Sequence, residues 1–239
     1  MPKPVIQIKT LTSWSFSRYS DYKRCPAKFK YNHLMGLKEP GSAAMDRGSL
    51  IHSLAEKYVK GAVPAKLPPE LASFDVELKA LRKTFSKWPD WLVVEDTWAF
   101  DKDWGQSQWD DWVNCWLRVK LDLAEWLDGE TMVVRDWKTG KLRPELQEEY
   151  LEQLELYALA AFLRFPELLE VRPELCYLDL GKVYPEKPLA YRRADAPELL
   201  AKWNKRVAPM FKDKLFAPRP NDKCCWCWYR KDNNGPCKY

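Results

Sequence analysis

The sequence has 239 residues, 46% of them hydrophobic and 31% charged, which is enough apolar material for one sizeable core. It contains no long apolar run, and its first ten residues lack the apolar stretch of a signal peptide, so we expect a soluble, cytoplasmic protein that does not span a membrane. The formal net charge is +5, but residues 1–40 and 202–239 are basic and residues 41–201 are acidic, a distribution that suits a polyanionic partner and a metal site as well as an ordinary solvated surface.

The first part of the chain has helical patterns. Residues 13–35 are expected to form two helical pieces, with Pro26 in the first turn of the second. An amphipathic helix is predicted over 46–61, where apolar residues recur at four-residue spacing, and another over 69–88 begins near Pro69.

The pattern changes after residue 90. Strands are predicted over 91–100, 113–126 and 131–137, a long helix over 145–165 after Pro144, further strands over 173–180 and 187–192, and a last helix over 196–213. This order favours an α/β fold with a central mixed sheet flanked by helices. We expect a single domain over 1–239, in which 1–40 and the irregular tail 214–239 form a cap that carries a cysteine site.

The segment "VVRDWKTGK", residues 133–141, holds the first candidate site residues. Asp136 and Lys138 are two apart on a predicted strand, so their side chains share a face about 7 Å apart. Asp122 lies in the preceding strand, before a "DG" hairpin signal; an odd-length loop would put it on the same face as Asp136, and a two-residue turn on the opposite face. Two carboxylates beside a lysine would suit Mg²⁺ or Mn²⁺ and phosphodiester hydrolysis, whereas the motif alone is more typical of a charged surface hairpin.

Three more polar residues could complete such a site. His52 lies on the predicted helix 46–61, and imidazole is a good ligand for Mn²⁺. Gln153 and Tyr157 are four residues apart on the helix after the lysine strand, so both can face a phosphate or a water molecule. Taken singly, each also has an ordinary structural explanation, as a helical histidine, a surface glutamine and a core tyrosine.

Seven cysteines without a signal peptide argue against a disulfide framework, and four of them lie in the last sixteen residues. Cys224 and Cys227 form a C-x-x-C pair, Cys237 follows a Gly-Pro turn, and Cys25 is a distant cysteine in a polar setting. These four could hold zinc or an iron–sulfur cluster. Cys225, which forms a C-x-C pair with Cys227, is the alternative to Cys224.

Six motifs follow one another along the chain. They are "SFSRYSDYKRCPAKFKY", "RGSLIHSLAEKY", "VKLDLAEW", "VVRDWKTGK", "QLELY" and the terminal cysteine group. This ordered set resembles the RecB-like branch of the PD-(D/E)XK nucleases and is most similar to stand-alone phage members and CRISPR adaptation exonucleases, which carry a four-cysteine [4Fe-4S] cluster. The resemblance covers nearly the whole chain from about Ser13, and six motifs in the right order are far more specific than any one of them.

The resemblance implies a restriction-endonuclease-like fold and a role for each candidate residue. It implies that His52, Asp122, Asp136 and the Trp137 carbonyl bind the metal, that Lys138 is the catalytic lysine, that Gln153 and Tyr157 form the Q-x-x-x-Y motif, and that Cys25, Cys224, Cys227 and Cys237 bind the cluster. Many relatives carry glutamate where Asp136 stands, and the spacing from Cys227 to Cys237 is on the long side.

The implied function is a Mg²⁺- or Mn²⁺-dependent deoxyribonuclease, an exonuclease acting on single-stranded or frayed DNA ends. The chain has no G-x-x-x-x-G-K-[ST] motif, so unwinding would come from a helicase, or from a recombination or CRISPR partner. A phage-encoded protein of this kind would work in the host cytoplasm. Two alternatives stay open: a catalytically silent DNA-binding module of the same fold, and a zinc-stabilised interaction protein.

Overall fold

The structure is a computed structural model that describes residues 8–239, so the first seven residues of the expected cap lie outside it. The chain forms two compact units, one made of Met1–Pro40 with Lys202–Tyr239 and the other of Gly41–Ala201. In the described part, no helix is long and apolar enough to cross a membrane.

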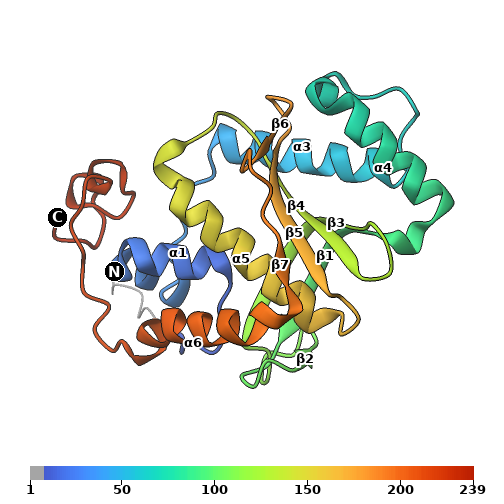
Figure 1. The fold of residues 1–239 in the computed structure, drawn as a ribbon. Helices are drawn as coiled ribbons and strands as arrows, with labels where there is room; N and C mark the ends of the chain where they lie inside the picture. Colours follow the sequence, from blue (N-terminus) through green and yellow to red (C-terminus); the bar gives the residue numbers. More distant parts are fainter. Residues whose placement is uncertain (1–7) are drawn as a thin grey trace. The chain divides into compact units, whose positions relative to one another are not determined.

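The larger unit is built on one mixed sheet. Its strands are β1 (Leu92–Phe100), β2 (Gln106–Ser107), β3 (Leu117–Trp126), β4 (Thr131–Lys138), β5 (Glu170–Tyr177), β6 (Lys182–Tyr184) and β7 (Tyr191–Arg192). They are ordered β2-β1-β3-β4-β5-β6, with β7 also paired to β5. Only the β4–β5 pair is parallel, so the chain must cross over between these strands, and it does so through a helix. The predicted central mixed sheet with flanking helices is therefore confirmed (Figure 1).

Three helices accompany this sheet: α3 (Ala43–Val59), α4 (Asp75–Lys87) and α5 (Gln147–Arg164). Ser42 caps α3 by accepting a hydrogen bond from the Met45 N–H at 3.2 Å. Pro144 opens a single 3₁₀ turn before α5, whose first turn is acidic and whose last turn contains Arg164, the charge order that the helix dipole favours. These local signals explain why the predicted helix 145–165 lies within two residues of α5.

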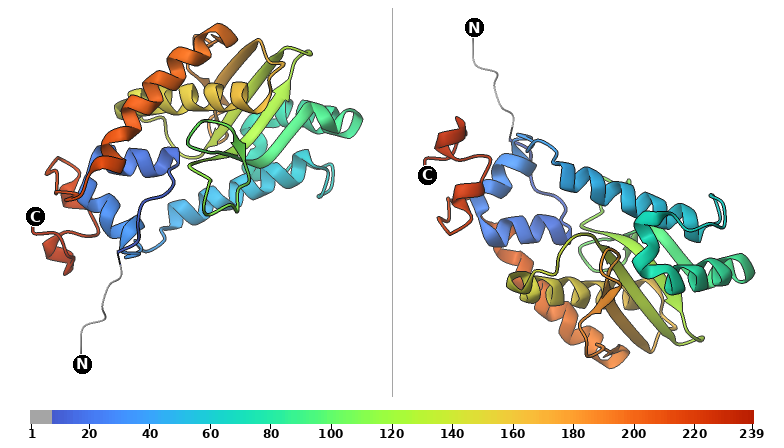
Figure 2. Two further views of the ribbon diagram at one scale, coloured as in Figure 1. Left: turned by 90° about the horizontal axis from the view of Figure 1, so that it is seen from below. Right: turned by 90° about the horizontal axis from the view of Figure 1, so that it is seen from above.

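The larger unit has an apolar core between α3, α4 and the sheet. Its fully buried members include Ile51, Leu78, Leu123 and Trp137. The flanking helices α3 and α4 run side by side in Figures 1 and 2, which is how their apolar faces share this core. Because Ile51 precedes His52 and Trp137 lies between Asp136 and Lys138, the core fixes the backbone that carries the candidate site.

The strands differ from those predicted in several places. The strand predicted over 187–192 forms only at Tyr191–Arg192, β2 and β6 lie outside the predicted strands, and β5 ends at Tyr177 and not at residue 180. β3 begins at Leu117 and not at residue 113, because the Asp111 carboxylate accepts hydrogen bonds from the N–H groups of Val113 and Asn114 and so holds a turn there. β5 begins at residue 170, before Pro173, although proline cannot donate a ladder hydrogen bond. Pro173 is accommodated because β7 pairs before it and β6 pairs after it, which leaves a gap in the ladder (Figure 1).

The smaller unit contains α1 (Phe16–Arg24), α2 (Pro26–Phe29), a π-helical turn (Lys30–Leu34) and the part of α6 (Ala196–Lys212) from Lys202 onward. Its centre is the Trp203 ring, which stacks on Trp14 at 5.6 Å between centroids and meets the Tyr19 ring edge-on at 5.3 Å. The C-terminal tail adds two 3₁₀ turns, Cys224–Trp226 and Lys231–Asn233.

Trp203 should be essential to the stability of the smaller unit, since its side chain is fully buried. Replacing it by alanine leaves a large cavity, and we expect the free energy of unfolding to fall by about 3–5 kcal/mol in urea titrations. Trp226→Ala is the matched control, because 85% of Trp226 is exposed and its loss should change the free energy by no more than about 0.5 kcal/mol. Equal destabilisation by both substitutions would contradict this description of the core.

Candidate active site

The connection between β3 and β4 decides where Asp122 points. The Leu127 N–H donates to the Thr131 carbonyl at 2.9 Å, so the loop between the paired residues is the three residues 128–130. The Asp128 carboxylate holds this loop by accepting from the N–H groups of Glu130 and Thr131. The loop therefore has an odd number of residues. When the register is continued by one residue past the Leu123–Arg135 pair, Asp122 lies opposite Asp136, and both side chains are on the same face of the sheet.

A third carboxylate, Glu95, joins them from β1. The β1–β3 register pairs Val94 with Leu123 and Asp96 with Leu121, which sets Glu95 opposite Asp122. Glu95 has a φ of +50°, a left-handed conformation that costs a non-glycine residue on the order of 1–3 kcal/mol and often marks functional sites. Sequence reasoning missed Glu95, because nothing in "WLVVEDTWAF" signals either the strained backbone or the cross-strand neighbour.

The histidine of α3 completes a compact group of ligand atoms. His52 Nδ1 lies 3.2 Å from Asp122 Oδ1 and 3.6 Å from Glu95 Oε1. One ligand atom from each of His52, Glu95 and Asp122 lies within 4.8 Å of the others, and among residues 8–239 this is the one group of three or more His, Cys, Asp or Glu with that spacing. Nitrogen and hard carboxylate oxygens are a suitable donor set for Mn²⁺ or Mg²⁺.

Asp136 and Lys138 lie beside this group and are held by α5. Lys138 Nζ is 2.6 Å from Asp136 Oδ2 and donates to Gln153 Oε1 at 3.0 Å. Gln153 Nε2 and the Tyr157 hydroxyl both donate to Asp136 Oδ1, at 3.1 and 2.8 Å. The four sequence-predicted residues on β4 and α5 therefore form one hydrogen-bonded network.

Trp137 contributes its backbone. Its N–H donates to Asp122 Oδ2 at 2.7 Å, a buried contact that fixes this carboxylate. In an extended strand the N–H and the carbonyl of one residue point to the same neighbour, so the Trp137 carbonyl faces the β3 side, where Asp122 lies. Its side chain packs in the apolar core and meets the His52 imidazole edge-on, with the ring centroids 5.9 Å apart.

Asp179 connects the end of β4 to α3. Asp179 accepts two hydrogen bonds from the Arg47 guanidinium, at 2.8 and 2.6 Å, and one from the Gly140 N–H at 2.5 Å. Gly140 has a φ of +82°, a conformation in which glycine is favoured, so the chain can turn away directly after Lys138. This connection holds α3, which carries His52, close to the end of β4, which carries Lys138.

The electrostatics follow from burial and from the crowding of charges. Burial disfavours the cationic form of His52, but its hydrogen bond to Asp122 and its close approach to the Glu95 carboxylate outweigh this and raise its pKa to about 10. Burial raises the pKa of Asp122, and the neighbouring Asp136 adds to this, against the opposing hydrogen bond from His52. Burial disfavours the charge on Lys138, yet Asp136 more than compensates and the lysine pKa is raised. A cation that binds the His52 nitrogen must displace a proton, so its affinity should increase with pH.

Two buried oxygens fit the binding of a cation. Glu95 Oε1 and Asp136 Oδ2 are shielded from solvent and accept no hydrogen bond, although each has a cationic side chain nearby. The 2.6 Å approach of Lys138 to Asp136 Oδ2 is an ion pair without hydrogen-bond alignment. Buried carboxylate oxygens of this kind are usually satisfied, and a divalent ion held by the His52, Glu95 and Asp122 group would satisfy that of Glu95.

Comparison with known families identifies the superfamily of the chain. The family model described as "PD-(D/E)XK nuclease superfamily" matches residues 13–231 of the chain. The chain belongs to the PD-(D/E)XK nuclease superfamily. Nucleases of this superfamily usually use divalent metals, and the His52, Glu95 and Asp122 group is where this member could hold one.

Two solved structures are similar to the chain at low sequence identity. One, described as "Putative exonuclease" from Eubacterium rectale, has a TM-score of 0.50 and 11% identity, and the match covers 95% of this chain and 90% of that chain. Another, named SSO0001, has a TM-score of 0.41 and 15% identity, with 97% and 89% covered. No curated protein matches the sequence.

The sequence-predicted cysteines all belong to the smaller unit of the nuclease. Burial raises the pKa of Tyr31, and the thiols of Cys237, Cys25 and Cys227, in that order, add to this effect, so three of the four are close enough to influence one phenol group. The Arg219 and Asn221 N–H groups donate to the sulfur atoms of Cys25 and Cys224, at 3.5 and 3.3 Å. The Cys225 side chain is exposed and donates to the Asp222 carbonyl.

Divalent cations should stabilise the nuclease through the His52, Glu95 and Asp122 group. At Mn²⁺ concentrations near 100 times Kd, we expect the free energy of unfolding to rise by about 2.7 kcal/mol, with a matching increase in Tm measured by calorimetry. Asp122→Asn should abolish this increase, and Glu77→Gln, which changes an exposed carboxylate on α4, should preserve it. An Asp122→Asn variant that responds to Mn²⁺ like the unaltered protein would rule out this metal site.

Proposed function

We propose that the chain is a metal-dependent DNA nuclease that hydrolyses phosphodiester bonds. The observation that carries the proposal is the proximity of one imidazole and two carboxylates, with ligand atoms within 4.8 Å of one another, next to the Asp136–Lys138 ion pair. Membership of the PD-(D/E)XK superfamily supports the same conclusion. His52, Asp122, Asp136 and the Trp137 carbonyl are the proposed metal ligands, together with Glu95.

A bound Mg²⁺ or Mn²⁺ ion would polarise the phosphodiester and lower the pKa of a water nucleophile. The protein itself orients the ligands of this ion. The hydrogen bond from the Trp137 N–H and the contact with His52 fix both oxygens of Asp122. The ligand set is thus held before substrate binds, which reduces the reorganisation that the reaction requires.

Lys138 is the proposed catalytic cation. Its ammonium group is largely buried, contacts Asp136 and Gln153, and lies 5.4 Å from the centroid of the Tyr150 ring. Burial strengthens its field, and the raised pKa keeps it protonated through the neutral pH range. A fixed positive charge at this position can stabilise the negative charge that develops on the phosphate and orient the attacking water.

Gln153 and Tyr157 are proposed to be positioning residues. Gln153 accepts a hydrogen bond from Lys138 and donates to Asp136, so it sets the distance between the cation and the carboxylate. The Tyr157 hydroxyl donates to the same oxygen of Asp136 and is itself contacted by Gln153 Nε2 at 2.9 Å. Burial raises the pKa of Tyr157 far above its usual value, so it remains a hydrogen-bond donor.

The proposed substrate is DNA with single-stranded or frayed ends, cut from the end. The similar structure from Eubacterium rectale carries the description "Putative exonuclease", and the basic N- and C-terminal segments favour a polyanionic partner. Because the chain has no P-loop motif, a helicase or a recombination or CRISPR partner is proposed to supply unwound ends.

A [4Fe-4S] cluster is proposed for Cys25, Cys224, Cys227 and Cys237. The support is the grouping of three thiols around Tyr31 and the two N–H···S contacts, since hydrogen bonds to sulfur are typical of iron–sulfur sites. Cys225 is exposed and its thiol bonds to a nearby carbonyl, which favours Cys224 as the ligand.

Lys138→Ala tests the proposed activity. We expect this substitution to lower the rate of cleavage about 10²- to 10⁴-fold, because it removes the charge that stabilises the transition state. The assay uses single-stranded and duplex DNA labelled at either end, with Mg²⁺ or Mn²⁺, and so also reports polarity. Lys141→Ala changes an exposed lysine three residues on and should retain activity. Unchanged cleavage by Lys138→Ala would mean that the site lies elsewhere.

Spectroscopy and metal analysis test the cluster. Anaerobically purified protein should be coloured, show the broad thiolate-to-iron charge-transfer absorbance, and contain about four iron atoms per chain. Cys25→Ala should lose colour and iron, whereas Cys225→Ala should keep both. A colourless preparation that contains zinc would overturn the cluster assignment in favour of a zinc site.

A further inference from the structure

The segment between β1 and β3 exposes aromatic surface close to the candidate active site. Trp112 is 74% exposed and Trp109 is 37% exposed. Single exposed indoles occur elsewhere on this chain, as at Trp88 and Trp226, so the grouping of these two rings is what distinguishes the segment.

The two indoles share one arginine. The guanidinium carbon of Arg118 lies 4.5 Å from the centroid of the Trp112 ring and 5.8 Å from that of the Trp109 ring. Arg118 Nε also donates to the Trp109 carbonyl at 3.0 Å. We call this group of Trp109, Trp112 and Arg118 the tryptophan platform; it combines aromatic faces with a cation, which is the combination that binds stacked bases.

The platform is held in place although it is exposed. The Asp111 carboxylate accepts hydrogen bonds from the N–H groups of Val113 and Asn114 and from the Asn114 side chain, all at 2.9–3.0 Å. These bonds fix the turn that carries Trp112. A surface that is already ordered loses little conformational entropy when a ligand binds.

The platform is connected to the active site by β3. Arg118, Lys120 and Asp122 alternate along the strand and so lie on one side of it, while the residues between them are buried. Lys120 Nζ contacts Glu95 Oε2 at 2.8 Å, which places it beside the proposed metal ligands. From Arg118 to Asp122 the strand advances about 13 Å, a distance that a few nucleotides can span.

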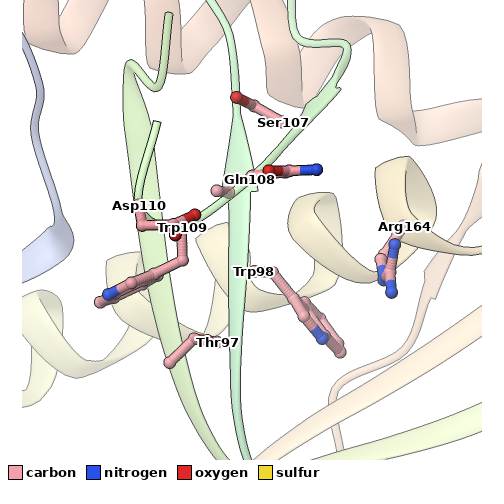
Figure 3. A pocket seen from close by; sticks show the side chains of 8 residues that line it. Thr97, Trp98, Ser107, Gln108, Trp109, Asp110 and Arg164 are labelled. Carbon is pink, nitrogen blue, oxygen red and sulfur yellow. The ribbon is translucent and has the colours of Figure 1, made fainter. Parts of the chain in front are cut away.

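A cavity of about 230 Å³ adjoins the platform. It is lined by Trp109 together with Thr97, Trp98, Ala99, Ser107, Gln108, Asp110 and Arg164. Figure 3 shows Thr97 and Trp98 on β1, the segment that carries Ser107 to Asp110, and Arg164 on the neighbouring helix. Hydroxyl, amide, carboxylate and guanidinium groups beside the Trp98 and Trp109 indoles can bond to the edge of a nucleobase whose face is stacked.

We propose that the tryptophan platform and its cavity bind unpaired nucleobases of a single-stranded DNA segment whose backbone passes the candidate active site. The proposal rests on the proposed nuclease function for the nature of the ligand. Asp110 and Asp111 are close by and would repel phosphates, so the platform engages bases and leaves the backbone to Lys120 and the metal site. It selects single strands because paired bases do not offer free faces.

Equilibrium binding in EDTA tests the proposal without requiring cleavage. The probes are a labelled single-stranded oligonucleotide, the same strand with one abasic position moved along it, and the blunt duplex. Trp112→Ala should weaken binding of the intact strand about 5- to 150-fold, the range for loss of one stacked base, with an unchanged salt dependence. Trp112→Phe should recover part of the affinity, and Trp88→Ala, which removes another indole that is 52% exposed, should change nothing.

The abasic series identifies the base. In the unaltered protein, one or two abasic positions should weaken binding, and Trp112→Ala should remove that sensitivity while leaving duplex binding unchanged. The proposal is wrong if Trp112→Ala binds the intact strand normally, if strand and duplex lose affinity equally, or if the substitution changes only the oligomeric state. Cleavage that survives Lys138→Ala would instead contradict the proposed function and leave these binding results intact.

Discussion

The structure depends on holding three carboxylates together on adjacent strands. Glu95, Asp122 and Asp136 are successive neighbours across β1, β3 and β4, where opposed residues are about 5 Å apart. At that distance two like charges repel by roughly 3 kcal/mol at an effective dielectric constant of 20. The cationic side chains around them, His52, Lys120 and Lys138, offset this repulsion. A site that concentrates negative charge in this way is suited to a divalent cation.

Each flanking element serves this cluster. The three-residue loop after β3 sets the register that aligns Asp122 with Asp136, and the parallel β4–β5 pair requires a crossover helix, which brings Gln153 and Tyr157 to Asp136. The ties from Asp179 to Arg47 and Gly140 keep α3 beside the lysine strand. The fold therefore assembles the proposed nuclease site, and the proposed tryptophan platform lies on the same strand, β3.

The sequence predicted the elements whose ends and patterns depend on neighbouring residues in the chain. Pro144 and the acidic first turn defined α5, and the residue pattern defined β1 and β4. β3 began later than predicted because the Asp111 turn is a side-chain effect, and the strand predicted over 187–192 formed only at Tyr191–Arg192. The sequence could not decide on which face of the sheet Asp122 lies, because a change of one residue in the length of the β3–β4 loop moves its side chain to the opposite face. Glu95 could not be found from the sequence, because its place depends on cross-strand register and on a left-handed backbone in the middle of a strand.

The central claim is that these carboxylates and His52 bind one divalent cation. Anomalous scattering from a crystal of the protein grown with Mn²⁺ tests it most directly. The account predicts a manganese peak within coordination distance of His52, Asp122 and at least one of Glu95 and Asp136. Manganese bound elsewhere, with the imidazole still bonded to Asp122, would contradict it.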